Sequence, residues 1–351
     1  MRILVDINHP AHVHLFKHAI KIWQERGDEV AITARDKDLT HKLLNELGFD
    51  FVPIPATSRG FFAYIKAVLV SNFRVWRVAR KFDPDLLIGT SFAVAHVSKL
   101  VRGKSMVFGE DDWASAKQFW RLVTPFADYI VTPDTILDKL GGNHIKYAGC
   151  QELAYLHPSR FQPNFSAIKK LLPSKRPYSV VRFVSYQAFH DQDESGLSST
   201  QSKKIVDLLK EYGDVYVSSE FNAEQAFWAD EMKVPLDMVH DLLAGAQILI
   251  SDSQTMTIEA ALLGIPSIRI NSFVGRIPVI EEIEKKYDLT YGFLPEDISD
   301  AKEKLIAILE NSEIRDEWKE KRDRYIKDKI ELTSWIVDFI DNLNQKEKHE
   351  N

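Results

Sequence analysis

The regular alternation of short apolar segments with longer segments of helical spacing is the feature that most constrains the fold. The first apolar runs are separated by helical patterns, beginning with the segment 11–26, which ends at Gly27. The runs are RILVDI (2–7), EVAITA (29–34), FVPI (51–54), DLLIGT (85–90), SMVFG (105–109) and DYIVTP (128–133). Short strands joined by helices of this length predict a parallel sheet with right-handed crossovers and helices on both faces.

The same alternation starts again after HPSRFQPNF (157–165), whose prolines and polar residues are typical of a linker. The second set of strands is YSVVRFV (178–184), DVYVSS (214–219), QILIS (247–251) and PSIRI (266–270). A chain of 351 residues is also too long for one ordinary core. We therefore predict an α/β fold with two Rossmann-like, doubly wound parallel-sheet domains, 1–160 and 170–330, that face a central cleft. Residues 331–351 are expected to form a C-terminal helix with a polar tail, whose sequence is compatible with packing back across the domain junction.

Composition and charge exclude several classes of protein. With 45% hydrophobic and 27% charged residues, the chain has the composition of a soluble globular protein. Its net charge of -6 argues against nucleic acid as a partner. The single cysteine, Cys150, excludes an internal disulfide framework and a cysteine-based zinc site. Asp6 interrupts the first apolar run, so this run is no signal segment, and no window has the length of a membrane span. We expect a cytoplasmic protein whose contact with membranes, if any, is peripheral.

One polar segment stands where an open parallel sheet binds its ligands, beyond the carboxyl end of a strand. After the strand QILIS, residues Ser251, Ser253, Gln254 and Thr255 form a turn that opens a helix bearing Glu259. Backbone amides and hydroxyls at such a helix start are suited to a diphosphate without the help of a metal, and Glu259 is suited to a ribose diol. The alternative is that Ser253 only caps the helix and Glu259 only interacts with the helix dipole.

The segment SDSQTMTIEAALLGIPSI (251–268) resembles the nucleotide-sugar site of glycosyltransferase-B-fold proteins, among them the UDP-N-acetylglucosamine 2-epimerases and related glycosyltransferases. The matching residues are Asp252, Ser253, Glu259, Gly264 and Pro266, while Gln254 and Thr255 replace two glycines of that pattern. The start DINHPAHVHLF (6–16) is similar to the first loop of the same superfamily, although this match is weaker. The resemblance covers nearly the whole chain. It implies an uncharacterised branch of the superfamily, a GT-B fold and a nucleoside-diphosphate-sugar substrate.

The first loop offers candidates for proton transfer. Asn8, His9 and His12 follow directly after the first strand, at its carboxyl end. Neutral imidazole accepts a proton from a sugar hydroxyl, so we expect either His9 or His12 to be the catalytic base, with Asn8 binding substrate. His14 is better explained by packing or solvation, and a metal site is disfavoured because Asp6 is the only carboxylate nearby.

Two further strand ends in the first domain carry polar residues. FGEDDWAS (108–115) places Glu110 and Asp111 together, and their mutual repulsion favours a raised pKa and a role as acid or base. The alternative for this acidic segment is helix capping. Gly89 and Thr90 follow another strand, where small polar residues allow a substrate to approach closely.

Strand ends of the second domain add weaker candidates for substrate binding. Arg182 is suited to a phosphate because guanidinium pairs with two oxygens at once. The remaining candidates are Ser185, Ser218, Glu220, His240, Asn271 and Arg276.

These observations favour a nucleotide-sugar-dependent, metal-independent glycosyltransferase that uses no cofactor and acts on an unknown sugar or lipid-linked acceptor, as in the synthesis of cell-surface polysaccharides or glycoconjugates. The alternatives are a nucleotide-sugar 2-epimerase or hydrolase and a non-catalytic nucleotide-sugar-binding protein. A dehydrogenase is disfavoured because the first strand leads into NHPAHVH and not into a Gly-x-Gly-x-x-Gly turn. The aromatic segment with Phe61, Phe62, Tyr64, Val68 and Trp76 is either an apolar lip for a hydrophobic acceptor or, the preferred interpretation, a core-facing helix.

Overall fold

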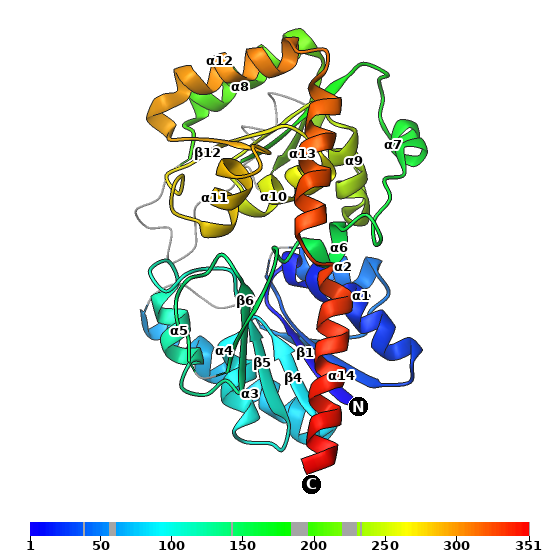
Figure 1. Ribbon diagram of the computed structural model, residues 1–351, viewed down its shortest axis with the longest axis vertical. Helices are drawn as coiled ribbons and strands as arrows, with labels where there is room; N and C mark the ends of the chain where they lie inside the picture. The colour runs from blue at the N-terminus through cyan, green and yellow to red at the C-terminus, as the bar shows by residue number, and fades with distance from the viewer. Residues whose placement is uncertain are drawn as a thin grey trace. The chain divides into compact units, whose positions relative to one another are not determined.

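The structure, a computed structural model, describes residues 1–37, 39–55, 61–141, 143–183, 196–219, 230–231 and 234–350 (Figure 1). The chain divides into two compact units. The first unit contains Met1–Arg160 and Ile330–Asn351, and the second contains Phe161–Lys329.

In the described part of the first unit, seven strands form one sheet in the order β3-β2-β1-β4-β5-β6-β7, with every neighbouring pair parallel. The strands are β1 (Arg2–Ile7), β2 (Glu29–Arg35), β3 (Val52–Ile54), β4 (Leu86–Gly89), β5 (Lys104–Phe108), β6 (Tyr129–Pro133) and β7 (His144–Tyr147). This order reverses direction between β1 and β4, which is the point where doubly wound sheets bind ligands.

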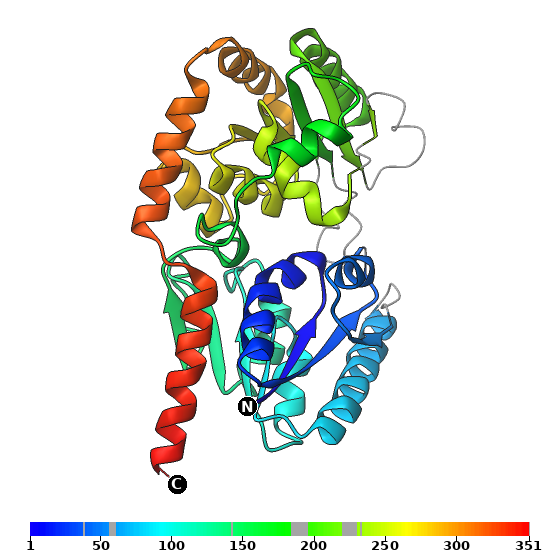
Figure 2. The same cartoon turned by 90° about the vertical axis from the view of Figure 1, so that its right-hand side faces the viewer.

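Helices cover both faces of this sheet (Figures 1 and 2). They are α1 (Pro10–Glu25), α2 (Thr40–Glu46), α3 (Phe61–Phe82), α4 (Phe92–Ser98), α5 (Lys117–Val123), α6 (Leu153–Leu156) and α14 (Leu332–Glu350). Helix α1 packs against α2, α6 and α14 on one face, and α4 packs against α3 and α5 on the other. Because both faces are covered, β1 is buried along almost its whole length and its side chains do not alternate between apolar and polar.

In the described part of the second unit, six strands form a parallel sheet in the order β10-β9-β8-β11-β12-β13. The strands are β8 (Tyr178–Phe183), β9 (Asp214–Ser219), β10 (Asp230–Glu231), β11 (Leu249–Ser251), β12 (Ser267–Ile270) and β13 (Tyr291–Phe293). The helices are α7 (Phe165–Leu171), α8 (Ser199–Tyr212), α9 (Val239–Gly245), α10 (Gln254–Leu263), α11 (Pro278–Lys285), α12 (Ile298–Glu310) and α13 (Ile314–Asp328), with 3-10 turns at Leu236–Met238 and Pro295–Asp297. Helices α8 and α12 contact each other, and α10 contacts α9, α11 and α13.

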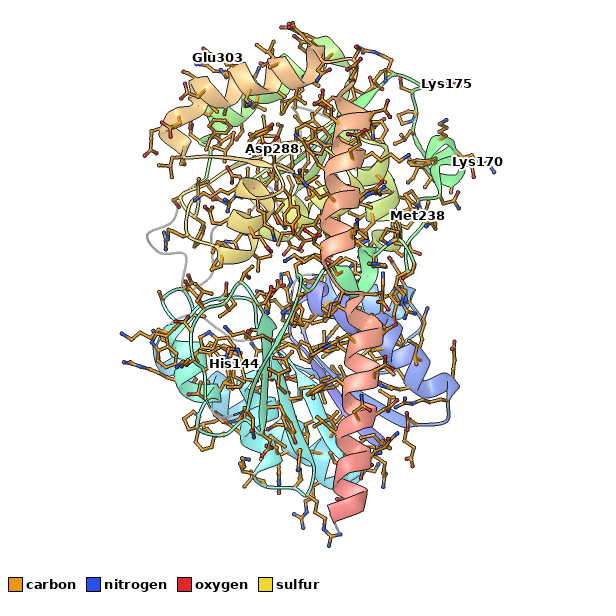
Figure 3. All side chains as sticks on the ribbon, viewed as in Figure 1. His144, Lys170, Lys175, Met238, Asp288 and Glu303 are labelled. Carbon is orange, nitrogen blue, oxygen red and sulfur yellow. The ribbon has the colours of Figure 1, made fainter. Side chains whose placement is uncertain are left out.

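Side chains fill the space between sheet and helices in each unit (Figure 3). In the first unit, Leu4, Leu87 and Val107 of the sheet belong to one buried cluster with Val75 of α3 and Trp120 of α5. In the second unit, residues of β8, β11 and β12 form one cluster with α8 and α12, and residues of β8 and β11 form another with α9 and α10.

The C-terminal helix α14 belongs to the first unit. It packs on α1 and α6, with Leu332 and Ile336 fully buried. The hydroxyl of Thr333 donates to the carbonyl of Ala154 at 2.7 Å, and Arg160 pairs with Glu331 at 2.9 Å. These contacts attach the last helix to the unit that contains the N-terminal part of the chain.

The expected fold class is confirmed: both units are doubly wound, parallel, Rossmann-like α/β domains. Several elements escaped the sequence analysis, namely β7, β10, β13, α7 and α11. Strand β7 lies at a sheet edge with β6 as its partner, and His144, which it carries (Figure 3), is 2.8 Å from the hydroxyl of Thr132. A short, half-buried edge strand has no continuous apolar run, so its sequence gives no strand signal.

Candidate functional site

Strand register determines which residues gather at the carboxyl edge of the second sheet. Ser251, the last residue of β11, lies opposite Arg182 of β8 on one side and Arg269 of β12 on the other. Arg182 in turn lies opposite Ser218 of β9. Three neighbouring strands therefore bring two guanidinium-bearing residues beside the turn that leads into α10.

The turn before α10 has the geometry of a capped helix start. The Ser253 hydroxyl accepts the Met256 N–H at 3.4 Å, and the Ser251 hydroxyl accepts the Ser253 N–H at 2.9 Å. The Gln254 and Thr255 amides belong to the first turn, whose N–H groups have no acceptor within the helix. Both side chains are only half-buried, and the first turn has no acidic residue. An anionic ligand therefore finds donors and the positive end of the helix dipole at this turn.

Glu259 lies one turn further along α10 and is fixed by His240. Its Oε1 atom is 2.9 Å from Nε2 of His240, and the two residues are 5% and 3% exposed. The sequence predicted both residues as substrate ligands but gave no sign that they contact each other. The structure shows that they form one buried pair below the capped turn.

Asn271 has a structural role at this edge. It is fully buried, its amide donates to the carbonyl of Asp252 at 2.8 Å, and its side-chain oxygen accepts the Phe273 N–H at 3.0 Å. It thus ties the loop after β12 to the loop after β11. Arg276, in contrast, is exposed and its guanidinium stacks on the ring of Phe273, 5.1 Å from the centroid.

The sequence analysis missed Arg269, which is fully buried in β12 and lies 3.7 Å from Glu281 and 3.8 Å from Glu284. A charged residue within the apolar run SIRI was the one available signal. Of the other predicted ligands, Ser185 and Glu220 lie outside the described residues, and Ser218 is described only by its place in β9.

In the first unit, His9 and His12 differ in their hydrogen bonds. His9 is the N-cap of α1, and its Nδ1 accepts the Ala11 N–H at 3.2 Å. Neutral His9 with this contact carries its proton on Nε2 and therefore donates from that atom. His12 instead has Nδ1 2.6 Å and Nε2 3.2 Å from the hydroxyl of Thr90, with the His9 and His12 rings 5.9 Å apart.

Positive charge surrounds His12. Burial lowers its pKa well below the usual value, and His9, Lys37 and Arg35 lower it further. Arg35 ends β2, next to the carboxyl end of β1, because Ala34 lies opposite Ile7. His12 is therefore neutral at pH 7 and is able to accept a proton. The sequence analysis missed the contributions of Arg35 and Lys37, which come from the end of β2 and from the loop after it.

Asp6, at the same edge, stays inside the fold. It is buried and accepts hydrogen bonds from Thr33 and Ser91, and burial raises its pKa. Packing explains the glycine at position 89 of β4: a Cβ atom there would lie 2.5 Å from the carbonyl oxygen of Asp6 in β1. Gly89 therefore allows β1 and β4 to lie close together, whereas the sequence analysis assigned the close approach to a substrate.

Glu110 is a half-buried carboxyl group that accepts the Gln151 N–H at 2.5 Å. Burial raises its pKa to about 8, with a smaller contribution from the charge of Asp111. Asp111 itself is exposed, and its carbonyl accepts the indole N–H of Trp120 at 3.0 Å. The neighbouring Asp112 caps a turn by accepting the Ser115 N–H at 2.7 Å. The two carboxyl groups of the predicted acid–base pair thus have different surroundings, and Glu110 is the one whose pKa is moved into the physiological range.

No cluster of three metal-binding side chains is found among the described residues. Within the same part of the chain, no helix has the length and apolar character needed to cross a membrane. The expected metal-independent reaction stays a prediction.

A family profile described as "Protein of unknown function (DUF354)" matches residues 1–277. The chain belongs to the DUF354 family. A search of curated proteins finds no match to this DUF354 chain.

Solved structures with the same architecture include UDP-GlcNAc 2-epimerases and glycosyltransferases. UDP-GlcNAc 2-epimerase from Neisseria meningitidis, bound to UDP-GlcNAc, is 13% identical with a TM-score of 0.67 over 97% of this chain and 99% of the other. Acinetobacter baumannii MurG is 13% identical, with a TM-score of 0.57 over 97% and 100%. The glycosyltransferase VinC in complex with dTDP is 14% identical, with a TM-score of 0.61 over 98% and 99%. The GT-B fold expected from the sequence resemblance is thereby confirmed.

Proposed function

We propose that this DUF354 protein is a metal-independent glycosyltransferase that moves a sugar from a nucleoside-diphosphate donor to a hydroxyl acceptor. The observation that carries the proposal is the capped start of α10, with half-buried Ser253, Gln254 and Thr255, at the carboxyl edge of the second sheet. Structural neighbours with this fold are described with UDP-GlcNAc, UDP or dTDP. A role in the synthesis of cell-surface polysaccharides or glycoconjugates in the cytoplasm is part of the proposal.

The donor's diphosphate binds the first-turn amides of α10 and the hydroxyls of Ser253 and Thr255. Arg182, opposite Ser251, supplies positive charge to the departing diphosphate. Glu259 accepts hydrogen bonds from the ribose diol and is held in position by His240. Amides, helix dipole and guanidinium together supply the charge that a divalent metal provides in other transferases.

The acceptor hydroxyl is deprotonated at the carboxyl edge of the first sheet. His12 is the candidate base of the two histidines, because its lowered pKa keeps it neutral at pH 7 and the capping contact of His9 makes that ring a donor. In the active tautomer, Nδ1–H of His12 donates to the hydroxyl of Thr90 at 2.6 Å, and Nε2, which lies 3.2 Å from the same hydroxyl, takes the acceptor proton. Nε2–H of His9 then binds an oxygen of the acceptor.

Calorimetric titration with UDP, dTDP, GDP and CDP, without added metal, tests the donor site. We expect one diphosphate to bind with a Kd in the micromolar range, and Glu259→Gln to weaken that binding while keeping the shape of the side chain. The nucleotide that binds then selects sugar donors for transfer assays. If none of the four binds, the donor site and the transferase proposal are wrong.

A nucleotide-sugar 2-epimerase or hydrolase is the second candidate, favoured by the epimerase neighbours and by Glu110, whose carboxyl is protonated at neutral pH. Incubation with the donor sugar alone separates the candidates. A transferase leaves the donor unchanged without an acceptor, whereas an epimerase inverts C2 and a hydrolase releases the nucleotide, both visible by proton NMR. Binding without any turnover would indicate a non-catalytic binding protein.

A further inference from the structure

The outer face of α3 in the first unit is exposed, apolar at one end and basic at the other. Leu69 and Phe73 are 64% and 55% exposed, and Val70 beside them is also exposed. The opposite face of the same helix, with Val75 and Ala79, is fully buried. Large apolar side chains on the exposed face of an otherwise well-packed helix mark an interaction surface.

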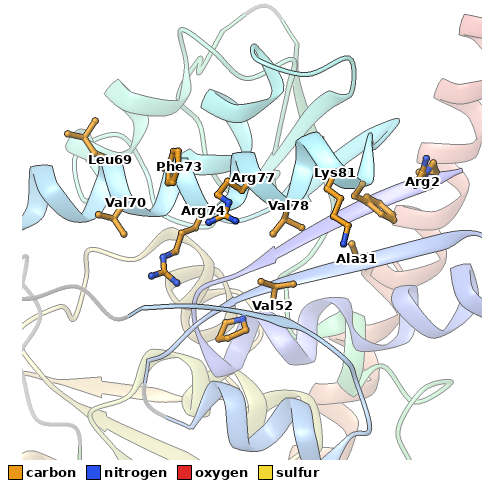
Figure 4. A pocket seen from close by; sticks show the side chains of 12 residues that line it. Arg2, Ala31, Val52, Leu69, Val70, Phe73, Arg74, Arg77, Val78 and Lys81 are labelled. Atoms are coloured by element: carbon orange, nitrogen blue, oxygen red, sulfur yellow. The ribbon is translucent and has the colours of Figure 1, made fainter.

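This apolar surface continues into a groove between α3 and the edge formed by β2 and β3 (Figure 4). The groove has a volume of about 1000 Å3. Val52 and Val78 line it together with the three exposed apolar residues of α3, and Arg74, Arg77 and Lys81 stand along it (Figure 4).

The sequence analysis preferred a core-facing helix here and named other residues of this helix for the alternative, an apolar lip. Trp76 is half-buried and packs against the core cluster, and Val68 is half-buried as well. The side chains of Phe61, Phe62 and Tyr64 lie outside the described part of the chain. Among the side chains of α3 that the structure describes, the exposed apolar face consists of Leu69, Val70 and Phe73.

Charge identifies the occupant of this face. Helix α3 contains five basic residues, Lys66, Arg74, Arg77, Arg80 and Lys81, and no acidic residue, in a chain of net charge -6. The last four are exposed side by side over the final turns of the helix. A second copy of this chain would bring the same positive charges against these basic residues and be repelled. A nucleic acid would contact the basic residues but would leave the apolar side chains of the face without an apolar partner. A helix with exposed apolar side chains beside a basic cluster fits the boundary between lipid headgroups and acyl chains.

We propose that α3 docks this protein onto an anionic lipid bilayer. Leu69, Val70 and Phe73 enter the acyl boundary, and the groove beside them adds apolar surface. Arg74, Arg77, Arg80 and Lys81 contact lipid phosphates. The proposal is independent of the donor site, because every residue that it uses lies in the first unit and none belongs to the proposed catalytic or nucleotide-binding residues.

Sedimentation of the full chain with lipid vesicles tests the proposed membrane docking. One vesicle type contains phosphatidylcholine alone, and the other contains about 30 mol% phosphatidylglycerol as well, which supplies the anionic charge that basic clusters bind. We expect binding to the anionic vesicles only. About 1 kcal/mol for each basic residue near a membrane surface corresponds to about fivefold weaker partitioning for Arg77→Gln. Loss of a buried aromatic side chain gives at least about tenfold weaker partitioning for Phe73→Ser. Binding should fall at about 0.5 M NaCl, which screens surface charge within a few ångströms.

Matched controls come from the same unit. Leu137→Ser removes an apolar side chain that is 85% exposed outside α3, and Lys42→Gln removes an exposed charge from α2. Both should partition like the unaltered protein, and unchanged thermal unfolding of all four variants shows that they are folded. Three results would overturn the proposal: no binding to anionic vesicles, equal binding to both vesicle types, or binding that Phe73→Ser and Arg77→Gln leave unchanged. A concentration-dependent dimer that Phe73→Ser dissolves would assign the face to self-association instead.

Discussion

At the scale of single residues, the proposed role of His12 as the base depends on its contact with Thr90. With Nδ1 of His12 2.6 Å from the Thr90 hydroxyl, His12→Gln is expected to lower kcat for transfer by about 10²–10⁴. Thr90→Val removes the group that selects the tautomer and is expected to lower kcat about tenfold, the value of one hydrogen bond. Thr90→Ser keeps the hydroxyl and should restore most of the rate.

The pH profile of kcat provides the check on this assignment. Because the pKa of His12 lies well below its usual value, the acid limb of the profile should fall well below pH 6.5. A Thr90→Val enzyme that turns over at the normal rate would show that His12 does not act through this tautomer.

Glu110 predicts a pH dependence of stability. Its carboxyl has a pKa of about 8 in the folded protein, against 4.5 as the ordinary value. Between these two values the folded state binds a proton that the unfolded state has lost, so stability falls as the pH rises from about 4.5 to about 8. Glu110→Gln is expected to remove this loss, which amounts to about 1–2 kcal/mol, or several degrees in Tm, for a half-buried group.

Thermal unfolding of both proteins between about pH 5 and pH 9 measures the difference. The two Tm curves should lie close together near pH 5 and separate progressively up to about pH 8, with the variant higher. Asp6 titrates in both proteins and cancels. Parallel curves across the whole range would mean that Glu110 is ionised in the folded state.

The candidate site was predictable from the sequence only in part, and these residues show why. Strand ends are visible in a sequence, so Asn8, Thr90, Glu110 and the Ser251–Thr255 turn were all placed at carboxyl edges. Which of them contact each other depends on register between strands and on helix packing. His12 and Thr90 are 78 residues apart, and His240 and Glu259 are 19 apart. No local pattern links such pairs, which is why the sequence analysis named Thr90 and His240 as substrate ligands without pairing them with His12 and Glu259.

At the scale of elements, α10 combines a structural cap with the proposed donor site, and a matched helix separates the two roles. Ser253 caps α10, and Ser198 caps α8 in the same unit through a reciprocal capping box with Gln201. Replacing either serine by alanine should cost about 1 kcal/mol of stability, since each change leaves a first-turn amide unsatisfied. Only Ser253→Ala is expected to weaken nucleoside-diphosphate binding, by about tenfold, because it also removes a ligand.

Chemical denaturation measures the first effect of these serine variants and calorimetry the second. Equal nucleotide affinity in both variants would limit Ser253 to capping, which is the alternative that the sequence left open.

At the scale of elements, the burial of a strand determines whether the sequence predicts it. Central strands such as β1 and β11 are buried on both faces and therefore have apolar runs that the sequence displays. The edge strands β7 and β13 are half-buried and three or four residues long, so HIKY and YGF have no such run. The breaks between α12 and α13 at Asn311 and between α13 and α14 at Lys329 carry no proline or glycine, so the sequence gives no signal of them.

At the scale of the whole molecule, the chain returns to its first unit through α14. The sequence shows that the tail is helical, yet only the burial of Leu332 and Ile336 and the contact between Arg160 and Glu331 show which unit it completes. The first unit is consequently built from the two ends of the chain, and its stability depends on a helix that follows the entire second unit.

This arrangement predicts which unit a substitution in the core destabilises. Ile336 is fully buried in α14, and Ile283 is fully buried in α11 of the second unit. Each substitution by alanine should cost about 2–5 kcal/mol because it leaves a cavity. Hydrogen exchange identifies the destabilised unit, because the amides of that cooperative unit lose their protection. Ile336→Ala should raise exchange in α1 and α6 while α10 stays protected, and Ile283→Ala should do the reverse. If Ile336→Ala also exposed the amides of α10, the two units would unfold together. The prediction that α14 stabilises the first unit alone would then be wrong.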